Sequence, residues 1–254
     1  MMFQVPAEAY QRFMGRYSEP LARELVRWLD PAAGRRALDV GCGPGALSAV
    51  LVERLGVRNV AAVDPSPPFV EAIRARLPGL DVRTATAEDL PFGEAEFDLC
   101  VASLVVHFMT DPSVGLRQMA RVTKPGGVVA ATVWDHGTGR GPLSPFWRAV
   151  HDLVDDPRDE SALPGSRPGD LAAWFRRAGL EDVHEGVLTV EVRHDSFREW
   201  WEPFTLGVGP AGAYVAGLDA ATRERLRAHC EDSMPPAPFT VSASAWCVTA
   251  RVSR

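Results

Sequence analysis

A glycine-rich segment at residues 37–45, Ala-Leu-Asp-Val-Gly-Cys-Gly-Pro-Gly, constrains the fold more than any other part of the chain. Its first four residues are mostly apolar and favour a short buried strand, which the glycines end in a tight turn. Glycines leave the backbone bare, so that a ligand can approach it closely. A helix that starts near Gly45 would add free N–H groups beside the turn. We therefore expect a ligand-binding strand, turn and helix within an α/β fold.

Short apolar runs alternate with amphipathic stretches along the rest of the chain. In the first half we expect strands at 37–40, 60–63, 81–84, 97–102 and 128–134, and helices at 45–55, 67–76 and 113–122. In the second half we expect helices at 146–154, 171–178 and 219–229, and strands at 187–192 and 239–252. This alternation predicts a doubly wound, mostly parallel, seven-stranded sheet, Rossmann-like, with helices on both faces and a helical insertion before the last strand.

The first thirty residues are also expected to be helical. Ser18 is followed by Glu19 and Pro20, an order typical of an N-cap and a first helical turn. Leu21 and Leu25 then fall on one face of the helix, which predicts that this face packs against the sheet.

Charge and cysteine usage exclude several classes of protein. The net charge is −6, and Lys124 is the only lysine, so the chain lacks the clustered positive charge of a nucleic-acid-binding protein. The four cysteines are scattered and are not at metal-ligand spacing, so we expect no metal site. No apolar run approaches the roughly 20 residues that span a bilayer, and no basic segment precedes an apolar one at the N-terminus. We expect a cytoplasmic protein without a membrane partner.

The spacing of the turn glycines separates two classes of ligand. A dinucleotide site requires G-x-G-x-x-G and binds pyrophosphate at the helix start, whereas Gly41, Gly43 and Gly45 form G-x-G-x-G. Asp39 lies two residues before Gly41. Its carboxylate offers no stabilisation to an anionic pyrophosphate, whereas it attracts the cationic amino group and sulfonium of S-adenosylmethionine. This favours a methyl-donor site over a dinucleotide site or a purely structural turn.

Asp64 closes the second expected strand. A carboxylate at this place can accept hydrogen bonds from both ribose hydroxyls of an adenosine. NAD enzymes share this feature, so it supports an adenosine without choosing the cofactor. The alternative is a helix N-cap, because Pro65, Ser66 and Pro67 follow.

Four motifs occur in a fixed order: Leu-Asp-Val-Gly-Cys-Gly-Pro-Gly at 38–45, Ala-Glu-Asp-Leu-Pro-Phe at 87–92, Phe-Asp-Leu-Cys-Val-Ala-Ser at 97–103 and Lys-Pro-Gly-Gly at 124–127. Their order and spacing resemble the class I S-adenosylmethionine-dependent methyltransferases of the UbiE-like, or methyltransferase 11, type. The resemblance covers about the first 135 residues. Segments 10–16, 131–135 and 200–212 also resemble a bacterial subgroup of small-molecule methyltransferases.

The resemblance implies a set of cofactor-binding residues in the first half of the chain. The set is Tyr10, Arg16, Asp39, Gly41, Cys42, Gly43, Gly45, Asp64, Pro65, Ser66, Thr86, Ala87, Glu88, Ala102 and Ser103. Within it, the glycines would pack on the methionine part of the cofactor and Asp39 would hold its amino group. Asp64 would take the ribose, while Ala87 and Glu88 would face the adenine.

Two members of this set need a further remark. Thr86 stands where the family often has an aspartate that accepts from the adenine amino group, and its hydroxyl accepts more weakly, so modest cofactor affinity is expected. Arg16 would pair with the carboxylate of the cofactor, because a guanidinium meets a carboxylate bidentately.

His107 and His136 are the candidate catalytic residues. His107 lies in an apolar run close to the expected methyl position, and His136 follows the fifth strand. A histidine in such a place acts either as a base or as a hydrogen-bonded structural residue. Trp200, Trp201, Phe204 and Tyr214 either pack under a helix or form a mobile cover over the acceptor.

We expect one domain over residues 1–254, with an N-terminal helical cover at 1–30 and a cofactor-binding core at 31–135. An acceptor-side half at 136–254 would carry a lid-like insertion at about 195–235. The expected function is methyl transfer from S-adenosylmethionine to a small molecule, leaving S-adenosylhomocysteine, by a monomer or a homodimer. The alternatives are an NAD-dependent oxidoreductase on a similar fold and a non-catalytic S-adenosylmethionine-binding protein.

Overall fold

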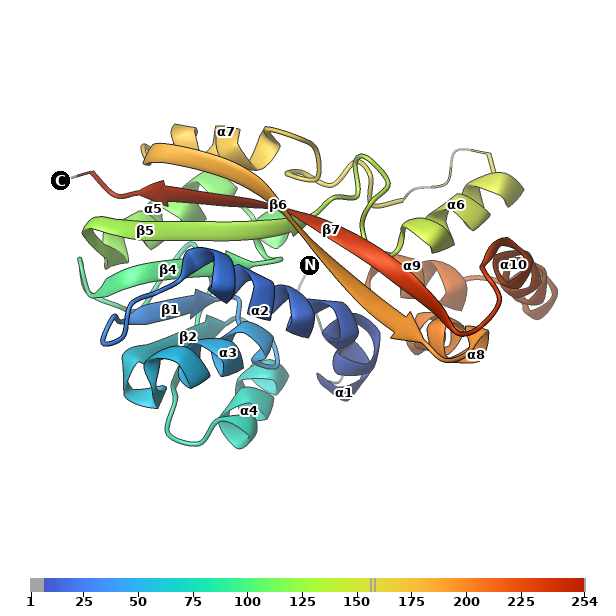
Figure 1. Cartoon of the computed structure of the whole chain (residues 1–254), viewed down its shortest axis with the longest axis horizontal. Helices are drawn as coiled ribbons and strands as arrows, with labels where there is room; N and C mark the ends of the chain where they lie inside the picture. Colours follow the sequence, from blue (N-terminus) through green and yellow to red (C-terminus); the bar gives the residue numbers. More distant parts are fainter. Residues whose placement is uncertain (1–6, 156, 158, 254) are drawn as a thin grey trace.

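A seven-stranded sheet with the order β3-β2-β1-β4-β5-β7-β6 forms the centre of the computed structural model, which describes residues 7–155, 157 and 159–253 (Figure 1). The strands are β1 Ala37–Val40, β2 Val60–Asp64, β3 Asp81–Thr84, β4 Phe97–Ser103, β5 Thr123–Trp134, β6 Glu181–His194 and β7 Phe239–Arg251. The helices are α1 Ala7–Tyr10, α2 Arg16–Leu29, α3 Ala46–Leu55, α4 Pro67–Arg76, α5 Pro112–Val122, α6 Ser144–Leu153, α7 Asp170–Arg177, α8 Phe197–Trp201, α9 Gly209–Ala216 and α10 Ala220–Ser233. The doubly wound α/β fold is confirmed.

The first five strands are parallel, whereas β7 runs antiparallel between β5 and β6. Every residue of β1 and β2 is buried, because helices cover both faces of the parallel part of the sheet. The strand order reverses between β1 and β4, since β1 pairs with β2 on one side and with β4 on the other. A parallel sheet binds ligands beyond the carboxyl ends of its strands at such a reversal.

Two apolar cores lie on opposite faces of the sheet. On one face, Leu25 of α2, Leu51 of α3 and Ile73 of α4 are fully buried in one cluster. On the other face, Met119 of α5 and Phe175 of α7 belong to a second cluster. The two cores hold the carboxyl ends of β1, β2 and β4 in fixed positions relative to one another.

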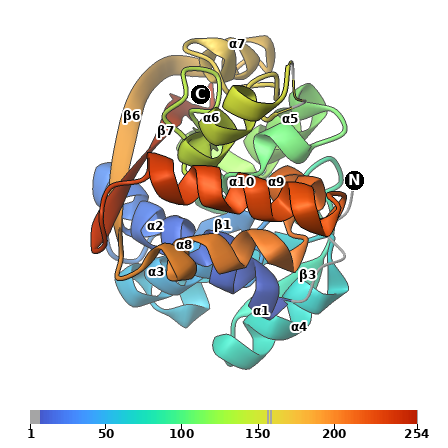
Figure 2. The same cartoon turned by 90° about the vertical axis from the view of Figure 1, so that its right-hand side faces the viewer.

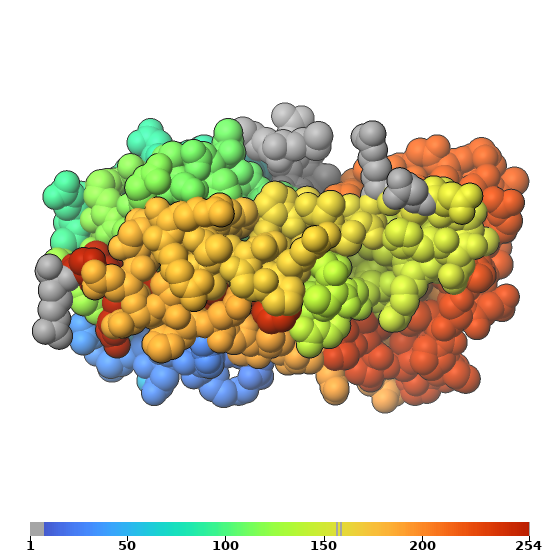
Figure 3. All heavy atoms as spheres, turned by 90° about the horizontal axis from the view of Figure 1, so that it is seen from above, coloured from blue at the N-terminus to red at the C-terminus, as the bar shows by residue number. Residues whose placement is uncertain are grey.

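A third apolar core fills the end of the molecule where β6 and β7 extend past the other strands (Figure 1). Helices α6, α8, α9 and α10 gather at this end and face the viewer in Figure 2. In the face seen in Figure 3, yellow to red segments form this end beyond the green and blue first half. Trp200, Trp201 and Phe204 are buried in this core, so these three rings pack in the protein interior.

The N-terminal helix differs from the expectation built on Ser18. A π-helical turn at Gln11–Gly15 runs directly into α2, so Ser18 and Pro20 lie inside a continuous helix and Ser18 is not its N-cap. The π-helical turn already interrupts the regular hydrogen-bond ladder ahead of Pro20, which itself lacks an N–H donor. Residues 1–6 of the expected helical segment lie outside the described residues.

Several element bounds are wider than expected. Strand β6 begins earlier, at Glu181, because it pairs with β7 over the whole length of β7. Strand β5 begins earlier, at Thr123, where it pairs with Phe97 of β4. None of the helices in the described ranges has both the length and the hydrophobicity that a membrane span requires.

Candidate functional site

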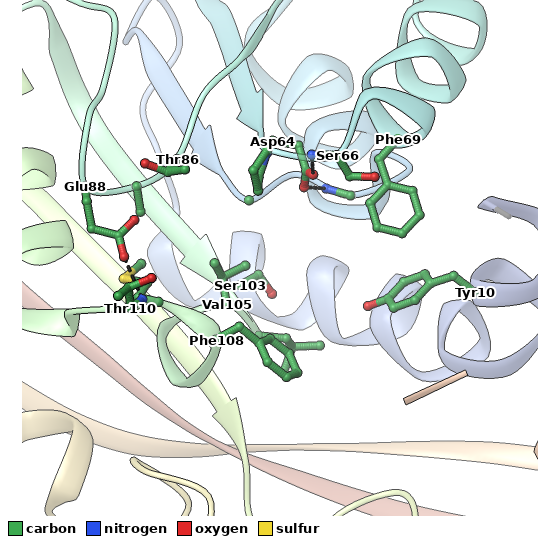
Figure 4. A pocket seen from close by; sticks show the side chains of 16 residues that line it. Tyr10, Asp64, Ser66, Phe69, Thr86, Glu88, Ser103, Val105, Phe108 and Thr110 are labelled. Atoms are coloured by element: carbon green, nitrogen blue, oxygen red, sulfur yellow. Dashed lines mark hydrogen bonds between the residues drawn. The ribbon is translucent and has the colours of Figure 1, made fainter. Parts of the chain in front are cut away.

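A pocket of about 300 Å³, here called the central pocket, lies at the carboxyl ends of β1 to β4. Thr86 and Glu88 line one end of it, and Tyr10 and Phe69 line the other (Figure 4). Asp64 lies between the two ends, on the side opposite the β4 end and the following loop. Residues that follow each of the four neighbouring strands therefore line the pocket, as expected for ligand binding beyond the carboxyl ends of a parallel sheet.

The glycine turn forms part of the floor of the central pocket. Gly41 and Gly43 have φ values of +71° and +52°, which favour glycine. A Cβ at Gly41 would lie 2.5 Å from Val105 Cγ2, whereas a Cβ at Gly43 would meet no atom within 4 Å. The turn thus needs glycine for packing at the first position and leaves open space at the second.

Gly45 lies outside the central pocket that Gly41 and Gly43 line. It lines none of the cavities described here, and a Cβ would lie 2.9 Å from Ile73 Cγ1 of α4. Its φ of +91° sets the N-cap of α3. Gly45 therefore allows α3 and α4 to approach each other, and its place among the cofactor-binding residues stays a prediction.

Asp64 joins the glycine turn to the second strand. Its Oδ2 accepts a hydrogen bond from the Gly43 N–H at 2.8 Å, and its Oδ1 accepts one from the Ser66 N–H at 2.8 Å. Burial raises the pKa of the Asp64 carboxyl despite these two bonds. Helix α4 starts at Pro67 with Ser66 as its N-cap, so Asp64 lies two residues too early for the alternative role of a helix cap.

A small inner cavity of about 40 Å³ continues the central pocket behind the glycine turn. Asp39 and Cys42 line it, and Asp39 Oδ2 accepts a hydrogen bond from Ser48 Oγ at 2.6 Å. Burial, and to a lesser degree the nearby Asp64, raises the pKa of Asp39 to about 7. Ser18 lines the same cavity, and its buried Oγ has no hydrogen-bond partner among the described residues.

Glu88 fixes the loop at Thr110 and Asp111, which borders the Thr86 end of the central pocket. Glu88 Oε1 accepts hydrogen bonds from the N–H groups of Thr110 at 2.7 Å and Asp111 at 3.3 Å. Thr86, Ala87 and Glu88 all line the pocket, together with Thr110. One oxygen of Glu88 is therefore already used by the protein.

Besides Gly45, two residues of the expected set, Arg16 and Ala102, lie outside the central pocket and the inner cavity. Arg16 forms an ion pair with Glu199 and donates to His194 Nδ1 at 3.0 Å, because the earlier start of the helix turns it toward α8 and β6. Ala102 is fully buried in the core, whereas Ser103, the next residue of β4, lines the pocket. Successive side chains of a strand point to opposite faces, which explains the difference.

Both candidate catalytic histidines line a third space, here called the lateral cavity, of about 50 Å³. It shares Tyr10, Leu104 and Phe108 with the central pocket. Burial lowers the pKa of His107 to about 3 and that of His136 to about 4, so both imidazoles are neutral near neutral pH. Neither histidine lines the central pocket.

The sequence interpretation missed much of the pocket wall after β4. The missed lining residues there are Leu104, Val105, Phe108, Met109 and Thr110, and Phe69 of α4 was missed as well. Leu104 has a φ of +63°, a costly conformation for a leucine and one that concentrates at functional sites. The rule that ligands bind beyond strand ends was the signal for this loop, since it directly follows β4.

All ionisable carboxyl and basic side chains that line the site, among the described residues, are acidic. The described residues that line the central pocket and the inner cavity include the carboxylates of Asp39, Asp64 and Glu88 and no arginine, lysine or histidine. The described residues contain no group of three or more histidine, cysteine or acidic side chains able to hold a metal ion. The four cysteines are free and buried. This arrangement suits a ligand with positive charge and an adenosine-sized body, and it disfavours a pyrophosphate.

Comparison with known proteins agrees with this geometry. A family of methyltransferase domains matches residues 38–131. An uncharacterized methyltransferase of Mycobacterium tuberculosis is 41% identical over 157 residues, which span 61% of this chain and 61% of the relative. The matched region is thus less than two thirds of that relative's length.

Two further proteins resemble the chain over more of its length. The demethylmenaquinone methyltransferase of Clavibacter sepedonicus is 29% identical over 218 residues, 78% of this chain and 82% of that protein. The crystal structure of the YcgJ protein from Bacillus subtilis superposes with a TM-score of 0.59 at 18% identity, over 94% of this chain and 99% of that one. The likeness to YcgJ concerns the fold alone.

Proposed function

We propose that this chain, which belongs to the methyltransferase domain family through its residues 38–131, is an enzyme that transfers a methyl group from S-adenosylmethionine to a small molecule. The observation that carries the proposal is the set of carboxylates around the glycine turn. Asp39 and Asp64 stand beside Gly41 and Gly43 with no lining cation among the described residues. A cationic amino group and sulfonium gain from this potential, whereas the pyrophosphate of NAD would be repelled.

The residues present fit this cofactor on two independent points. The unpartnered Ser18 Oγ and the carboxylate of Asp39 line the inner cavity. There Asp39 would be the counter-charge of the cofactor's amino group, and the Ser18 hydroxyl would donate a hydrogen bond to its carboxylate. The open space beside Gly43 leaves the backbone bare toward a ligand. The adenosine would lie in the larger central pocket, with Asp64 at the ribose and Thr86, Ala87 and Glu88 near the base.

The bound cofactor would supply a methyl group that its sulfonium already makes electrophilic, so the protein needs mainly to bind and orient. Tyr10, Leu104 and Phe108 separate the central pocket from the lateral cavity, because they line both. These side chains would exclude water from the reacting groups and restrict the direction from which an acceptor approaches. Holding two reactants in line at about 3–3.5 Å accounts for many orders of magnitude in rate.

A small-molecule acceptor agrees with the charge of the chain and with the relatives. The net charge of −6 gives no electrostatic basis for binding RNA or DNA. The relative from Clavibacter is named for methylating demethylmenaquinone, a small molecule. The cavities beside the glycine turn also measure at most about 300 Å³, which suits a cofactor with a compact acceptor.

The decisive experiment combines binding with turnover. S-adenosylmethionine is incubated with the protein and a pool of metabolites, and mass spectrometry follows S-adenosylhomocysteine and any product heavier by one methyl substitution. We expect both to appear together. If S-adenosylmethionine binds but no metabolite is methylated, a non-catalytic binding protein is favoured. NADH binding in an absorbance titration would favour an oxidoreductase.

Asp64 offers a variant test of the cofactor assignment. We expect Asp64→Ala to abolish detectable S-adenosylmethionine binding in calorimetry, because it removes both the ribose contact and the bonds to Gly43 and Ser66. Asp64→Asn keeps one acceptor oxygen and should weaken binding less. Unchanged affinity in both variants would remove the ribose assignment.

A further inference from the structure

Apart from Tyr10, Leu104 and Phe108, the residues that line the lateral cavity lie outside the central pocket. N-terminal residues Phe13 and Met14 line it, as do Val208 and Pro210 from the insertion between β6 and β7. Besides Tyr10, its polar side chains come from three other places: His107 after β4, Trp134 and His136 at the end of β5, and Glu160 from the loop between α6 and α7. At about 50 Å³ the cavity accepts the reacting end of a molecule rather than a large body.

Two buried nitrogen atoms on this wall have no hydrogen-bond partner among the described residues. They are His107 Nδ1 and Trp134 Nε1. A buried polar group without a partner loses its hydration and gains nothing in return, so such groups are rare unless a ligand satisfies them. The indole N–H of Trp134 can only donate, so the ligand must offer an oxygen or nitrogen with a lone pair.

Glu160 contributes a buried carboxyl to the same wall. Only 6% of its surface is exposed, and its Oε2 accepts a hydrogen bond from Trp147 Nε1 at 2.7 Å. Burial raises the pKa of Glu160 to about 7. No arginine or lysine is among the described residues that line the cavity, so nothing there would balance the charge of an anionic ligand.

We propose, on the basis of the proposed function, that the lateral cavity binds the methyl acceptor and that Glu160 selects an acceptor with a neutral hydroxyl on an apolar or aromatic body. A hydroxyl can donate to Glu160 and accept from Trp134 Nε1 at once. An ammonium group has no lone pair for Trp134, and a carboxylate would be repelled by Glu160. Phenols and enols combine the required group with a flat apolar body that fits among Phe13, Phe108 and Trp134.

The test compares four probes that share one ring: phenol, anisole, benzylamine and benzoate. Their binding to the full-length protein is measured by saturation-transfer NMR in the presence of S-adenosylhomocysteine. We expect phenol to bind roughly threefold to tenfold more tightly than anisole, the range that one neutral hydrogen bond supports. Benzylamine and benzoate should bind more weakly than phenol. Equal binding of phenol and anisole, or tighter binding of benzoate, would overturn the proposal.

Variants of Glu160 test whether this residue causes the preference for phenol over anisole. Glu160→Met should remove the preference for phenol over anisole, whereas Glu160→Gln keeps an acceptor oxygen and should retain part of it. Glu202→Gln, which changes a charged residue of the insertion outside the cavity, is the matched control and should behave as the natural protein. A preference that survives Glu160→Met would contradict the role of Glu160.

The result can be separated from the proposed function itself. S-adenosylmethionine binding is measured by calorimetry for every variant alongside the probes. If the natural protein does not bind S-adenosylmethionine, the proposed function is contradicted. If it binds S-adenosylmethionine but does not prefer phenol over anisole, only the acceptor proposal is contradicted. If Glu160→Met does not fold, the comparison of phenol with anisole on the natural protein still decides.

Discussion

At the scale of single residues, the buried carboxyl of Asp39 distinguishes this glycine turn from a pyrophosphate site. Its side chain is 1% exposed, and its described hydrogen-bond donor is the neutral hydroxyl of Ser48. No cation lines the inner cavity among the described residues, so the charged form of Asp39 is costly until a cationic ligand arrives. If the proposed function holds, the amino group of the cofactor would stabilise the charged form of Asp39.

Replacing Asp39 by asparagine tests this reading through the pH dependence of stability. The folded pKa of about 7 lies above the ordinary value of 3.8, so the contribution of Asp39 to stability is full below that value and is lost as pH rises through 7. Asp39→Asn should reduce the fall in the free energy of unfolding between about pH 5 and about pH 8 by on the order of 2 kcal/mol. Urea denaturation at the two pH values measures it, and an unchanged fall would contradict the burial of an unpaired carboxyl.

Gly43 provides a second prediction at this scale. Gly43→Ala introduces strain of about 1 kcal/mol at positive φ and places a methyl group in the open space beside the turn. We expect S-adenosylmethionine affinity to fall by roughly tenfold or more in calorimetry. Gly34→Ala is the control, because Gly34 has a φ of +81°, equally open surroundings and a position before β1, outside the pocket. Equal affinity loss in both variants would indicate a general effect of strain.

At the scale of elements, α2 is tied to α8 and β6 by the side chain of Arg16. The guanidinium pairs with Glu199 and donates to His194 Nδ1, and His194 Nε2 lies 3.2 Å from the hydroxyl of Tyr17. These contacts hold the N-terminal helix against the insertion that covers the lateral cavity. The cluster thus has a structural role, and the role of pairing with a cofactor carboxylate stays a prediction without support from the geometry.

A pair of variants separates the two roles of Arg16. Arg16→Ala and Glu199→Gln should each lower the free energy of unfolding by about 1 kcal/mol, since both side chains are about one third exposed. Both should leave S-adenosylmethionine affinity within about twofold. Denaturation and calorimetry on the same samples measure the two effects. A large affinity loss in Arg16→Ala alone would restore the cofactor contact.

The elements also show what sequence reasoning can and cannot reach. The sheet and the glycine turn were predictable because continuous apolar runs, helical periodicity and glycine spacing are local signals, as at 37–45. The pairing of Arg16 with Glu199 and the presence of Glu160 in the lateral cavity were not predictable. Each depends on how an element rotates or where a loop passes in the folded chain, and no local pattern records that.

At the scale of the whole molecule, three apolar cores position the walls of the central pocket and the lateral cavity. The two cores on the faces of the sheet fix the strand ends that line the central pocket. The third core, at the end seen in Figure 2, joins the N-terminal helix to α6 and the insertion, and it borders the lateral cavity. Cofactor and acceptor would therefore meet at Tyr10, Leu104 and Phe108, which both spaces share.

The most direct measurement of the central claim is a calorimetric titration of the natural protein with S-adenosylmethionine and, separately, with NADH at neutral pH. The carboxylate-lined turn predicts saturable binding of one S-adenosylmethionine per chain and no detectable binding of NADH. Saturable binding of NADH, or no heat with S-adenosylmethionine at millimolar concentration, would contradict the account of the pocket around Gly41, Gly43 and Asp64.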